Sequence, residues 1–299
     1  MIKVAIIGLD TSHSVEFPRL MQAPDCAPDQ RVAGLKAVTC LRFETPFQNK
    51  AGLDKRQEQL EAWGVKVTEK FEETVASCDA IMLEINDPAY HLEYFNKVAA
   101  LGKPVFLDKP LAGSEADGRE ILQLIRQHQT RVWSGSGVPF CPPLGETCAR
   151  FAEIKFGQVF GALGQAPAGD ALVWYGVHTF EMLQRIMGPG PKTVRAIEND
   201  NGIIAVVDYG KGRQGFVELI RGSWLYGGRL QGKCGNQEQV APFVCDLTYD
   251  YRDTLREVLK FFEGGAMPVA METTFEGLAM MLAARESIIR NAVTPVAAL

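Results

Sequence analysis

Two neighbouring stretches decide the fold: AIMLEINDPAYH at residues 80–91 and AALGKPVFLDKPLA at residues 99–112. Each contains a short apolar run that is typical of a buried strand, and a helical pattern lies between the two runs. A strand, a helix and a second strand in this order predict a βα unit, the element from which parallel sheets are built. The same alternation extends back to residue 1 and forward to residue 133.

Working outward from these stretches, we expect an α/β domain over residues 1–133. Its strands are predicted at residues 2–7, 32–38, 65–67, 80–85, 105–107 and 132–133, and its helices near residues 57–63, 91–101 and 114–128. The stretch SGSGVPFCPP that follows is rich in Gly, Ser and Pro, which is typical of a crossover between domains. The second domain is therefore predicted over residues 134–299.

The second domain has a different pattern, which predicts an α+β domain with a predominantly antiparallel open sheet. Helices are expected around residues 144–156, 178–187, 251–262 and 273–290, and strands at residues 194–198, 203–209, 215–220 and 225–231. The turns Asn201-Gly202 and Gly210-Lys211-Gly212 favour antiparallel hairpins, because Asn and Gly tolerate the positive φ of tight turns.

Composition excludes several classes of partner. The 31 Lys and Arg are interspersed with 36 Asp and Glu, which leaves a net charge of −5 and no basic stripe for nucleic acid. We find no stretch that would span a membrane, and the opening MIKVAIIG is typical of a strand and not of a secretory signal. A cytoplasmic protein with a small-molecule substrate is expected, and its seven scattered cysteines are expected to be reduced.

The turn IIGLDTSH after the first strand resembles an incomplete phosphate-binding loop. A dinucleotide fingerprint has glycines at the three positions that Gly8, Asp10 and His13 occupy here, so only the first is kept. The charge of Asp10 would repel a phosphate. Either this turn is purely structural, or Asp10 or Ser12 caps the next helix while Thr11 and Ser12 offer hydroxyls to an anion at its N-terminus.

The end of the second strand leaves the choice between NAD and NADP open. No acid stands at its tip to accept the ribose hydroxyls, as an acid does in NAD-binding domains. Arg42 there would favour the 2′-phosphate of NADP, although nearby Glu44 counts against this and a surface arginine without a cofactor role is an equally simple interpretation.

Together with the opening strand, the two stretches quoted first resemble the glucose-fructose oxidoreductase, inositol dehydrogenase and MocA (Gfo/Idh/MocA) family. The family usually has Glu-Lys-Pro where this chain has Asp108-Lys109-Pro110. A second segment, WYGVHTFE, is similar to the family's Asp-x-Gly-x-His-x-x-Asp. Its Gly, His178 and Glu match in kind, whereas Trp174 replaces an acid.

The resemblance implies a Rossmann domain that binds NAD or NADP and a second domain whose open sheet forms a homo-oligomer, a dimer or a tetramer. It implies an oxidoreductase that transfers a hydride between nicotinamide and a sugar, polyol or related hydroxy compound. Lys109 would lie beside nicotinamide and substrate, where its ammonium can hydrogen-bond a substrate oxygen. His178 would be the principal acid or base, because an ordinary histidine pKa of about 6.5 is close to working pH.

The residues expected at the site follow from these arguments. The catalytic residues are Lys109 and His178. The cofactor-binding residues are Gly8, Asp10, Thr11, Ser12, His13, Arg42, Asn86, His91, Asp108 and Lys109. The substrate-binding residues are Lys109, Trp174, Tyr175 and His178.

Several alternatives stay open. The departures at Asp10, His13 and Trp174 would also suit a protein of this fold that has lost redox chemistry and serves as a small-molecule binding or regulatory subunit. His91 is explained equally well by helix capping or packing, and the aromatic residues of the second domain by core packing. Asp10, His13, His91 and His178 could converge at the mouth of the sheet, but no two of them have the short spacing of a metal motif, so no metal site is predicted.

Overall fold

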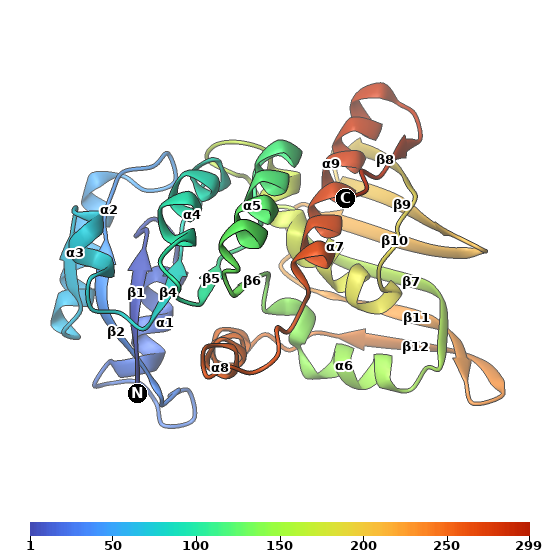
Figure 1. The fold of residues 1–299 in the computed structure, drawn as a ribbon. Coiled ribbons are helices and arrows are strands. Elements are labelled where there is room, and N and C mark those ends of the chain that lie inside the picture. Colours follow the sequence, from blue (N-terminus) through green and yellow to red (C-terminus); the bar gives the residue numbers. More distant parts are fainter. The chain divides into compact units, whose positions relative to one another are not determined.

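The computed structural model describes residues 1–299, which form two compact units (Figure 1). The first unit comprises Met1–Gly135 and Tyr251–Met271. The second comprises Ser136–Asp250 and Glu272–Leu299. None of the helices is long and apolar enough to cross a lipid bilayer.

The first unit is built on a parallel sheet with the strand order β3-β2-β1-β4-β5-β6. The strands are β1 (Ile2–Ile7), β2 (Leu35–Leu41), β3 (Lys66–Thr68), β4 (Ala80–Leu83), β5 (Val105–Leu107) and β6 (Val132–Ser134). Ala5 pairs with Ile81, which in turn pairs with Val105. The strand order reverses between β1 and β4, and ligands of such sheets bind at the carboxyl ends of the strands at this switch point. The predicted doubly wound α/β fold is confirmed.

Helices cover this sheet. They are α1 (His13–Gln22), α2 (Lys50–Ala62), α3 (Phe71–Val75), α4 (His91–Ala99) and α5 (Glu115–His128), with a 3₁₀ turn at Pro88–Tyr90. Three of them correspond to the predicted ranges, although α2 begins earlier than predicted and α3 was not predicted. Helix α5 begins where the Ser114 hydroxyl accepts a hydrogen bond from the amide of Asp117 and ends at Gln129, whose φ is 54°. These capping features explain why its predicted bounds are nearly correct.

A helix from late in the chain, α8 (Asp250–Phe262), completes the first unit. The sequence predicts this helix in the second domain, whereas residues Tyr251–Met271 group with the first unit. The reason is packing and capping: the Phe261 ring lies 6.4 Å from that of buried Trp133. Arg131 donates to the Phe261 carbonyl at 3.0 Å and the Gly265 carbonyl at 2.8 Å, which satisfies backbone groups at the end of α8.

The second unit contains a mixed sheet with the strand order β12-β11-β7-β10-β9-β8-β13. The strands are β7 (Glu153–Ala162), β8 (Thr193–Asn199), β9 (Gly202–Gly210), β10 (Arg213–Ile220), β11 (Gly227–Cys234), β12 (Gln237–Val244) and β13 (Thr294–Pro295). Only β7 and β10 pair in parallel, so the predicted antiparallel character is confirmed.

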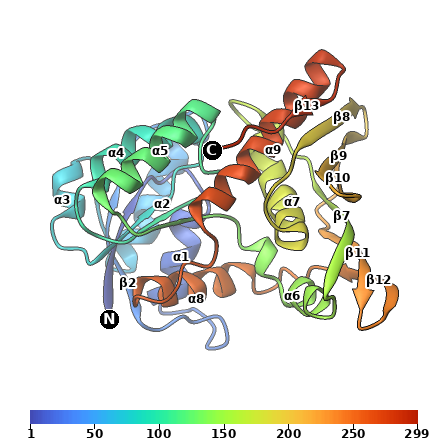
Figure 2. The same cartoon turned by 45° about the vertical axis from the view of Figure 1, so that its right-hand side comes forward.

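Helices of the second unit lie on one side of this sheet (Figure 2). They are α6 (Pro142–Ala149), α7 (Ala171–Met187) and α9 (Met271–Arg290), after a 3₁₀ turn at Val138–Phe140. The predicted helix over residues 144–156 is wrong in its second half, because α6 ends at Ala149 and β7 starts at Glu153. The glycines of β7 admit the close approach of α7, since a Cβ on Gly161 would lie 2.2 Å from Thr179 Oγ1.

No helix of the second unit covers the opposite side of the second sheet (Figure 2). Ile197 pairs with Ile204 there, and the two side chains are 51% and 43% exposed. Val206 pairs with Phe216, which continues the apolar row. Phe216 also lines a shallow hollow with Phe156, Gln158, Arg229 and Gln231.

Candidate functional site

The switch point of the first sheet gathers most of the predicted cofactor residues. The loop after β1 supplies Gly8, Asp10, Thr11 and Ser12, the start of α1 supplies His13, the loop after β4 supplies Asn86, and the end of β5 supplies Asp108 and Lys109. The residues predicted from the loop after β1 and those predicted from the end of β5 therefore lie at the same edge of the sheet, because the carboxyl ends of neighbouring parallel strands meet there.

Gly8 is required by the close approach of its loop to β4. Its φ is +102°, and a Cβ there would lie 2.2 Å from the carbonyl oxygen of Glu84. An L-residue is disfavoured on both counts. The first position of the fingerprint is therefore kept for the reason that the motif has in dinucleotide-binding domains, a tight turn directly after the strand.

Asp10 faces the protein and does not cap α1. Its carboxylate accepts hydrogen bonds from the Asn86 amide at 2.9 Å and from Thr45 Oγ1 at 2.7 Å, and the residue is 1% exposed. Burial raises the pKa of Asp10, against the effect of these hydrogen bonds. The expectation that Asp10 or Ser12 caps the helix is wrong, because Ser12 at the cap position makes no side-chain cap bond and Thr11 Oγ1 accepts from the His13 amide instead.

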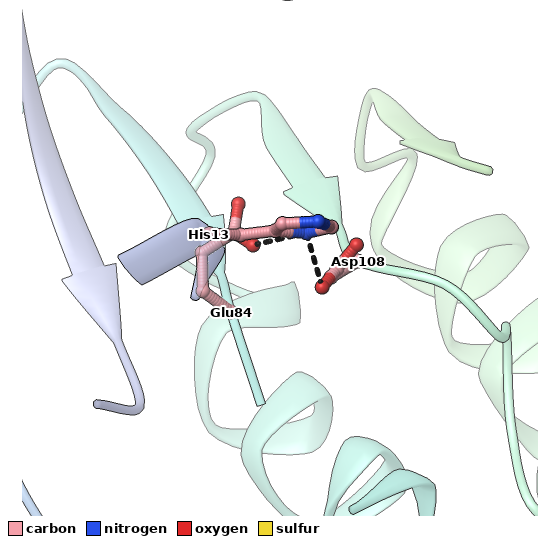
Figure 3. Close-up of side chains that lie close together, drawn as sticks. All are labelled: His13, Glu84 and Asp108. Carbon is pink, nitrogen blue, oxygen red and sulfur yellow. Dashed lines mark hydrogen bonds and ion pairs between the residues drawn. The ribbon is translucent and has the colours of Figure 1, made fainter. Parts of the chain in front are cut away.

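His13 replaces the last glycine of the fingerprint and joins two buried acids (Figure 3). Its Nδ1 lies 2.8 Å from Asp108 Oδ2 and 3.7 Å from Glu84 Oε2. The ring packs 5.2 Å from that of Phe17 and 5.1 Å from that of Tyr251 on α8, centroid to centroid. The imidazole thus fills the space between helix and sheet that a glycine would leave open.

The two acids respond to this surrounding in opposite directions. Burial raises the pKa of Asp108, but the charge and hydrogen bond of His13, with help from Lys109, outweigh burial and hold it below its usual range. Burial and then the nearby Asp108 carboxylate raise the pKa of Glu84 well above its usual range. Neither Glu84 oxygen has a hydrogen-bond partner, although the side chain is fully buried.

Lys109 is held at the same edge. It is 7% exposed, its amide donates to Asp108 Oδ1 at 2.8 Å, and the peptide bond to Pro110 is cis. Its ammonium lowers the pKa of both neighbouring acids. A buried cation beside carboxylates can donate hydrogen bonds to a substrate oxygen without first being desolvated.

His91 shapes the site through the backbone. The ring is fully buried, its Nε2 lies 2.8 Å from the Ile85 carbonyl oxygen, and its Nδ1 lies 3.3 Å from that of Leu111. Both nitrogens therefore face carbonyl groups on either side of the site. Packing between these two carbonyl groups accounts for His91 in this structure, and its contact with a cofactor stays a prediction.

Arg42 is occupied by helix α2. Its guanidinium donates to Gln57 Oε1 at 2.6 Å and to Asp54 Oδ1 at 2.5 Å. These two bonds occupy the guanidinium in this structure, and a 2′-phosphate would have to replace them. A structural link between β2 and α2 accounts for this residue, and the choice between NAD and NADP stays open.

The first unit fits a dinucleotide in part. Gly8 preserves the close turn, and Ser12 at the cap position of α1 makes no side-chain cap bond, although Thr11 Oγ1 accepts from the His13 amide. Asp10 is turned toward the Asn86 amide, so its carboxylate does not point from the loop into the crevice. Ser12 and His13 are the loop residues left accessible to a phosphate.

His178 lies in the second unit, on α7, with a partner that the sequence did not reveal. Ser136 Oγ lies 2.5 Å from His178 Nδ1 and accepts from the Val138 amide at 3.1 Å. The Ser136 amide donates to Glu181 Oε2 at 2.8 Å. Ser136 stands in the stretch interpreted as a linker, 42 residues before its histidine, which is why no local motif pointed to it.

Aromatic side chains surround the start of α7. The Trp174 ring lies 4.4 Å from that of Tyr175, and Tyr175 lies 5.7 Å from Trp224, which is 65% exposed. Tyr226 lies edge-on to His178 at 5.8 Å. The predicted substrate residues of this unit, Trp174, Tyr175 and His178, are therefore neighbours on one helix, with two further aromatic rings beside them.

The parallel sheet with its switch point and glycine turn defines the first unit as a dinucleotide-binding domain of the Rossmann type. Residues 2–136 match the Gfo/Idh/MocA family, described as an oxidoreductase family with an NAD-binding Rossmann fold. The match confirms the predicted resemblance to this family over these residues. No curated protein matches the chain.

Solved structures share the fold over the whole chain. One is scyllo-inositol dehydrogenase from Lactobacillus casei with bound NAD(H) and scyllo-inositol, at 15% identity and a TM-score of 0.77, covering 99% of each chain. Another is an oxidoreductase from Agrobacterium radiobacter in complex with NAD+, L-tartaric acid and magnesium, at 14% identity and a TM-score of 0.75, covering 99% of this chain and 98% of the other. A third is GenD2 from gentamicin A biosynthesis in complex with NAD, at 13% identity and a TM-score of 0.77, covering 99% of this chain and 97% of the other.

Proposed function

We propose that the chain is an NAD(P)-dependent oxidoreductase that transfers a hydride between nicotinamide and a sugar, polyol or related hydroxy compound. The observation that carries the proposal is the position of Lys109, a nearly buried lysine at the carboxyl end of β5, one strand from the switch point. This edge is where ligands of doubly wound sheets bind. Bound NAD(H) would supply the hydride acceptor or donor.

The proposed role of Lys109 is to orient and polarise the substrate. The bond from its own amide to Asp108 Oδ1 fixes the backbone of the corner. An ammonium donates hydrogen bonds to a hydroxyl or carbonyl oxygen, and stabilises the negative charge that builds up on that oxygen during hydride transfer.

The proposed role of His178 is to move the substrate proton. The Ser136 hydroxyl accepts from the Val138 amide, and its own proton is then available for Nδ1 of His178. In that arrangement Nε2 carries the proton of the neutral ring. The tautomer is our assignment, and Glu181 supports it by holding the Ser136 amide in place. Trp174 and Tyr175 would offer faces for the apolar side of a sugar ring.

The first test is a titration with NADH and NADPH, followed by nicotinamide fluorescence, and then a screen of sugars and polyols by reduction of NAD+ or NADP+. With a substrate identified, Lys109→Ala should lower kcat by roughly 10²–10⁴-fold and leave the Kd of NADH within about tenfold. Lys97→Ala is the matched control, since Lys97 pairs with Glu93 on the surface of α4. Wild-type turnover in Lys109→Ala would contradict the proposed role.

A second candidate function is a binding or regulatory subunit without redox chemistry. It is favoured by three buried carboxylates, Asp10, Glu84 and Asp108, at the edge where a dinucleotide would place its phosphates. If neither NADH nor NADPH binds saturably, oxidised or reduced, this function replaces the first. Binding of either nucleotide with turnover of any substrate excludes it.

We further propose that the chain forms a homo-oligomer, a dimer or a tetramer, through the open side of the second sheet. The apolar row with Ile197, Ile204 and Phe216 supports this, because monomers rarely leave such a surface in water. The hollow around Phe216 contains Arg229 and two glutamines, whose polar groups would meet their counterparts across a twofold axis.

A further inference from the structure

We propose that His13, Glu84 and Asp108 bind a divalent transition-metal ion, zinc or manganese, in the first unit. This inference goes beyond the proposed function, since the three ligands belong to the protein alone and need no nucleotide. It also revises the sequence prediction of no metal site. That prediction was based on local spacing, whereas these residues stand 71 and 24 positions apart along the chain, counting 84 − 13 and 108 − 84.

The geometry of the ligand atoms suits one ion. The candidate atoms, an imidazole nitrogen and one oxygen from each acid, all lie within 4.8 Å of one another. His13 Nδ1 is 2.8 Å from Asp108 Oδ2 and 3.7 Å from Glu84 Oε2. Around an ion with ligand distances of about 2.0–2.2 Å, neighbouring ligand atoms lie roughly 3–3.6 Å apart. Small side-chain rotations therefore complete the site.

The supports of the three ligands are rigid. His13 is the first residue of α1, Glu84 directly follows β4, and Asp108 directly follows β5. Figure 3 shows the imidazole lying between the two carboxyl groups. Because all three belong to the first unit and are anchored at the ends of regular elements, the site is largely formed before an ion binds.

Glu84 supplies an independent observation that points to a cation. Its side chain is fully buried, both oxygens lack a hydrogen-bond partner, and Oε2 is directed at His13. A buried carboxylate without a donor is costly unless a proton or a cation compensates it. Asp10 and Asp108 are further acids nearby, and the cations beside this group of acids are Lys109 and, at Asp10, Arg56.

A proton shared between Glu84 and Asp108 is the competing explanation. It would satisfy Glu84 and would leave the protein indifferent to metal ions. An ion instead displaces the proton of Glu84 and the one between His13 and Asp108, and both protons are released to solvent. The ligand set of one imidazole and two carboxylates favours zinc or manganese over calcium or magnesium, and it leaves coordination positions open for water or a substrate oxygen.

The test uses the full chain with any affinity tag removed. Metal content is measured on the purified protein, and the chelator-treated protein is titrated calorimetrically with ZnCl2 and MnCl2. We expect one equivalent per chain. Glu84→Gln keeps the shape of the side chain, and it should weaken binding by at least tenfold. Glu93→Gln is the matched control, because Glu93 is an exposed acid on α4 and should bind as the wild type does.

A second variant and an absorption spectrum show whether a loss of binding comes from the missing ligand or from misfolding of Glu84→Gln. His13→Asn should also weaken binding by at least tenfold, and Co2+ bound to the wild-type protein should show visible absorption that both variants lose. No metal in the purified protein together with no saturable binding below about 1 mM would overturn the proposal, as would wild-type affinity in a folded Glu84→Gln. The NADH titration is repeated on chelator-treated protein, so that failure of the proposed function is read separately.

Discussion

Replacement of Gly8 by alanine is expected to destabilise the first unit severely. The added Cβ would lie 2.2 Å from the Glu84 carbonyl oxygen, 2.9 Å from its carbonyl carbon and 2.9 Å from Ile85 Cγ1. Two of these atoms belong to the backbone that leaves β4, which cannot move without disturbing its pairing with β1. The residue would also have to keep a φ of +102°.

The magnitude has two parts. A non-glycine residue in a sparsely populated backbone region costs about 1–3 kcal/mol, and overpacking against a fixed neighbour costs about another 1–3 kcal/mol. Together these amount to roughly 2–6 kcal/mol, against a total stability of about 5–15 kcal/mol for an ordinary domain. Gly64→Ala separates the two parts, because Gly64 has a φ of +80° but nothing within 4 Å of its Cβ position.

Urea unfolding followed by tryptophan fluorescence provides the assay. Trp63 and Trp133 report on the first unit. Trp174 and Trp224 belong to the second unit, so both are mutated to phenylalanine in the parent protein and in each glycine variant. The midpoint of Gly8→Ala should fall well below that of Gly64→Ala. If the two variants unfold within about 0.5 kcal/mol of each other, the contact with β4 is not what requires glycine, and our account of the turn is wrong.

Three further predictions concern other parts of the chain. Burial raises the pKa of Asp10, so the folded state binds the Asp10 proton more tightly than the unfolded chain does. The free energy of unfolding therefore falls as pH rises from the ordinary aspartate pKa through the raised pKa of the folded state. In Asp10→Asn, the melting temperature should change less between about pH 4 and pH 7 than in the wild type. His91→Ala should cost about 2–4 kcal/mol in urea unfolding, because it removes a fully buried ring and both of its carbonyl contacts, and a loss under 1 kcal/mol would argue against that role. Phe216→Glu should shift the chain to monomer in sedimentation velocity, and an unchanged sedimentation coefficient would exclude the open sheet side as the interface.

The fold of the first unit could be predicted well because the sequence patterns that indicate its strands are local. β5 is predicted with the correct bounds, and β1 as well, since a strand that is buried on both faces is a continuous apolar run that ends at polar residues. The second sheet has weaker signals. The glycines of β7 suggest a break in the chain, although they are the small residues that α7 requires, and β12 is polar enough to suggest a loop.

The site was harder to predict because its contacts join distant parts of the chain. Asp10 was expected to affect its own helix, but its partners are Thr45 and the Asn86 amide. Glu84 received no role, although a signal existed: it is a charged residue that directly continues an apolar strand. A charge in such a position needs compensation, and the sequence alone could not say that Asp108 and His13 lie beside it.

The contacts of His13 with Glu84 and Asp108 account for the absence of a glycine at position 13. The third glycine of a dinucleotide loop lets the first helix pack closely on the sheet. Here an imidazole takes that space, Asp108 holds its Nδ1, and Phe17 and Tyr251 cover its ring. Restoring glycine at position 13 would remove the only imidazole facing Glu84 and Asp108. The result would be two buried acids side by side without the imidazole between them, so His13→Gly should lose stability even though it restores the motif.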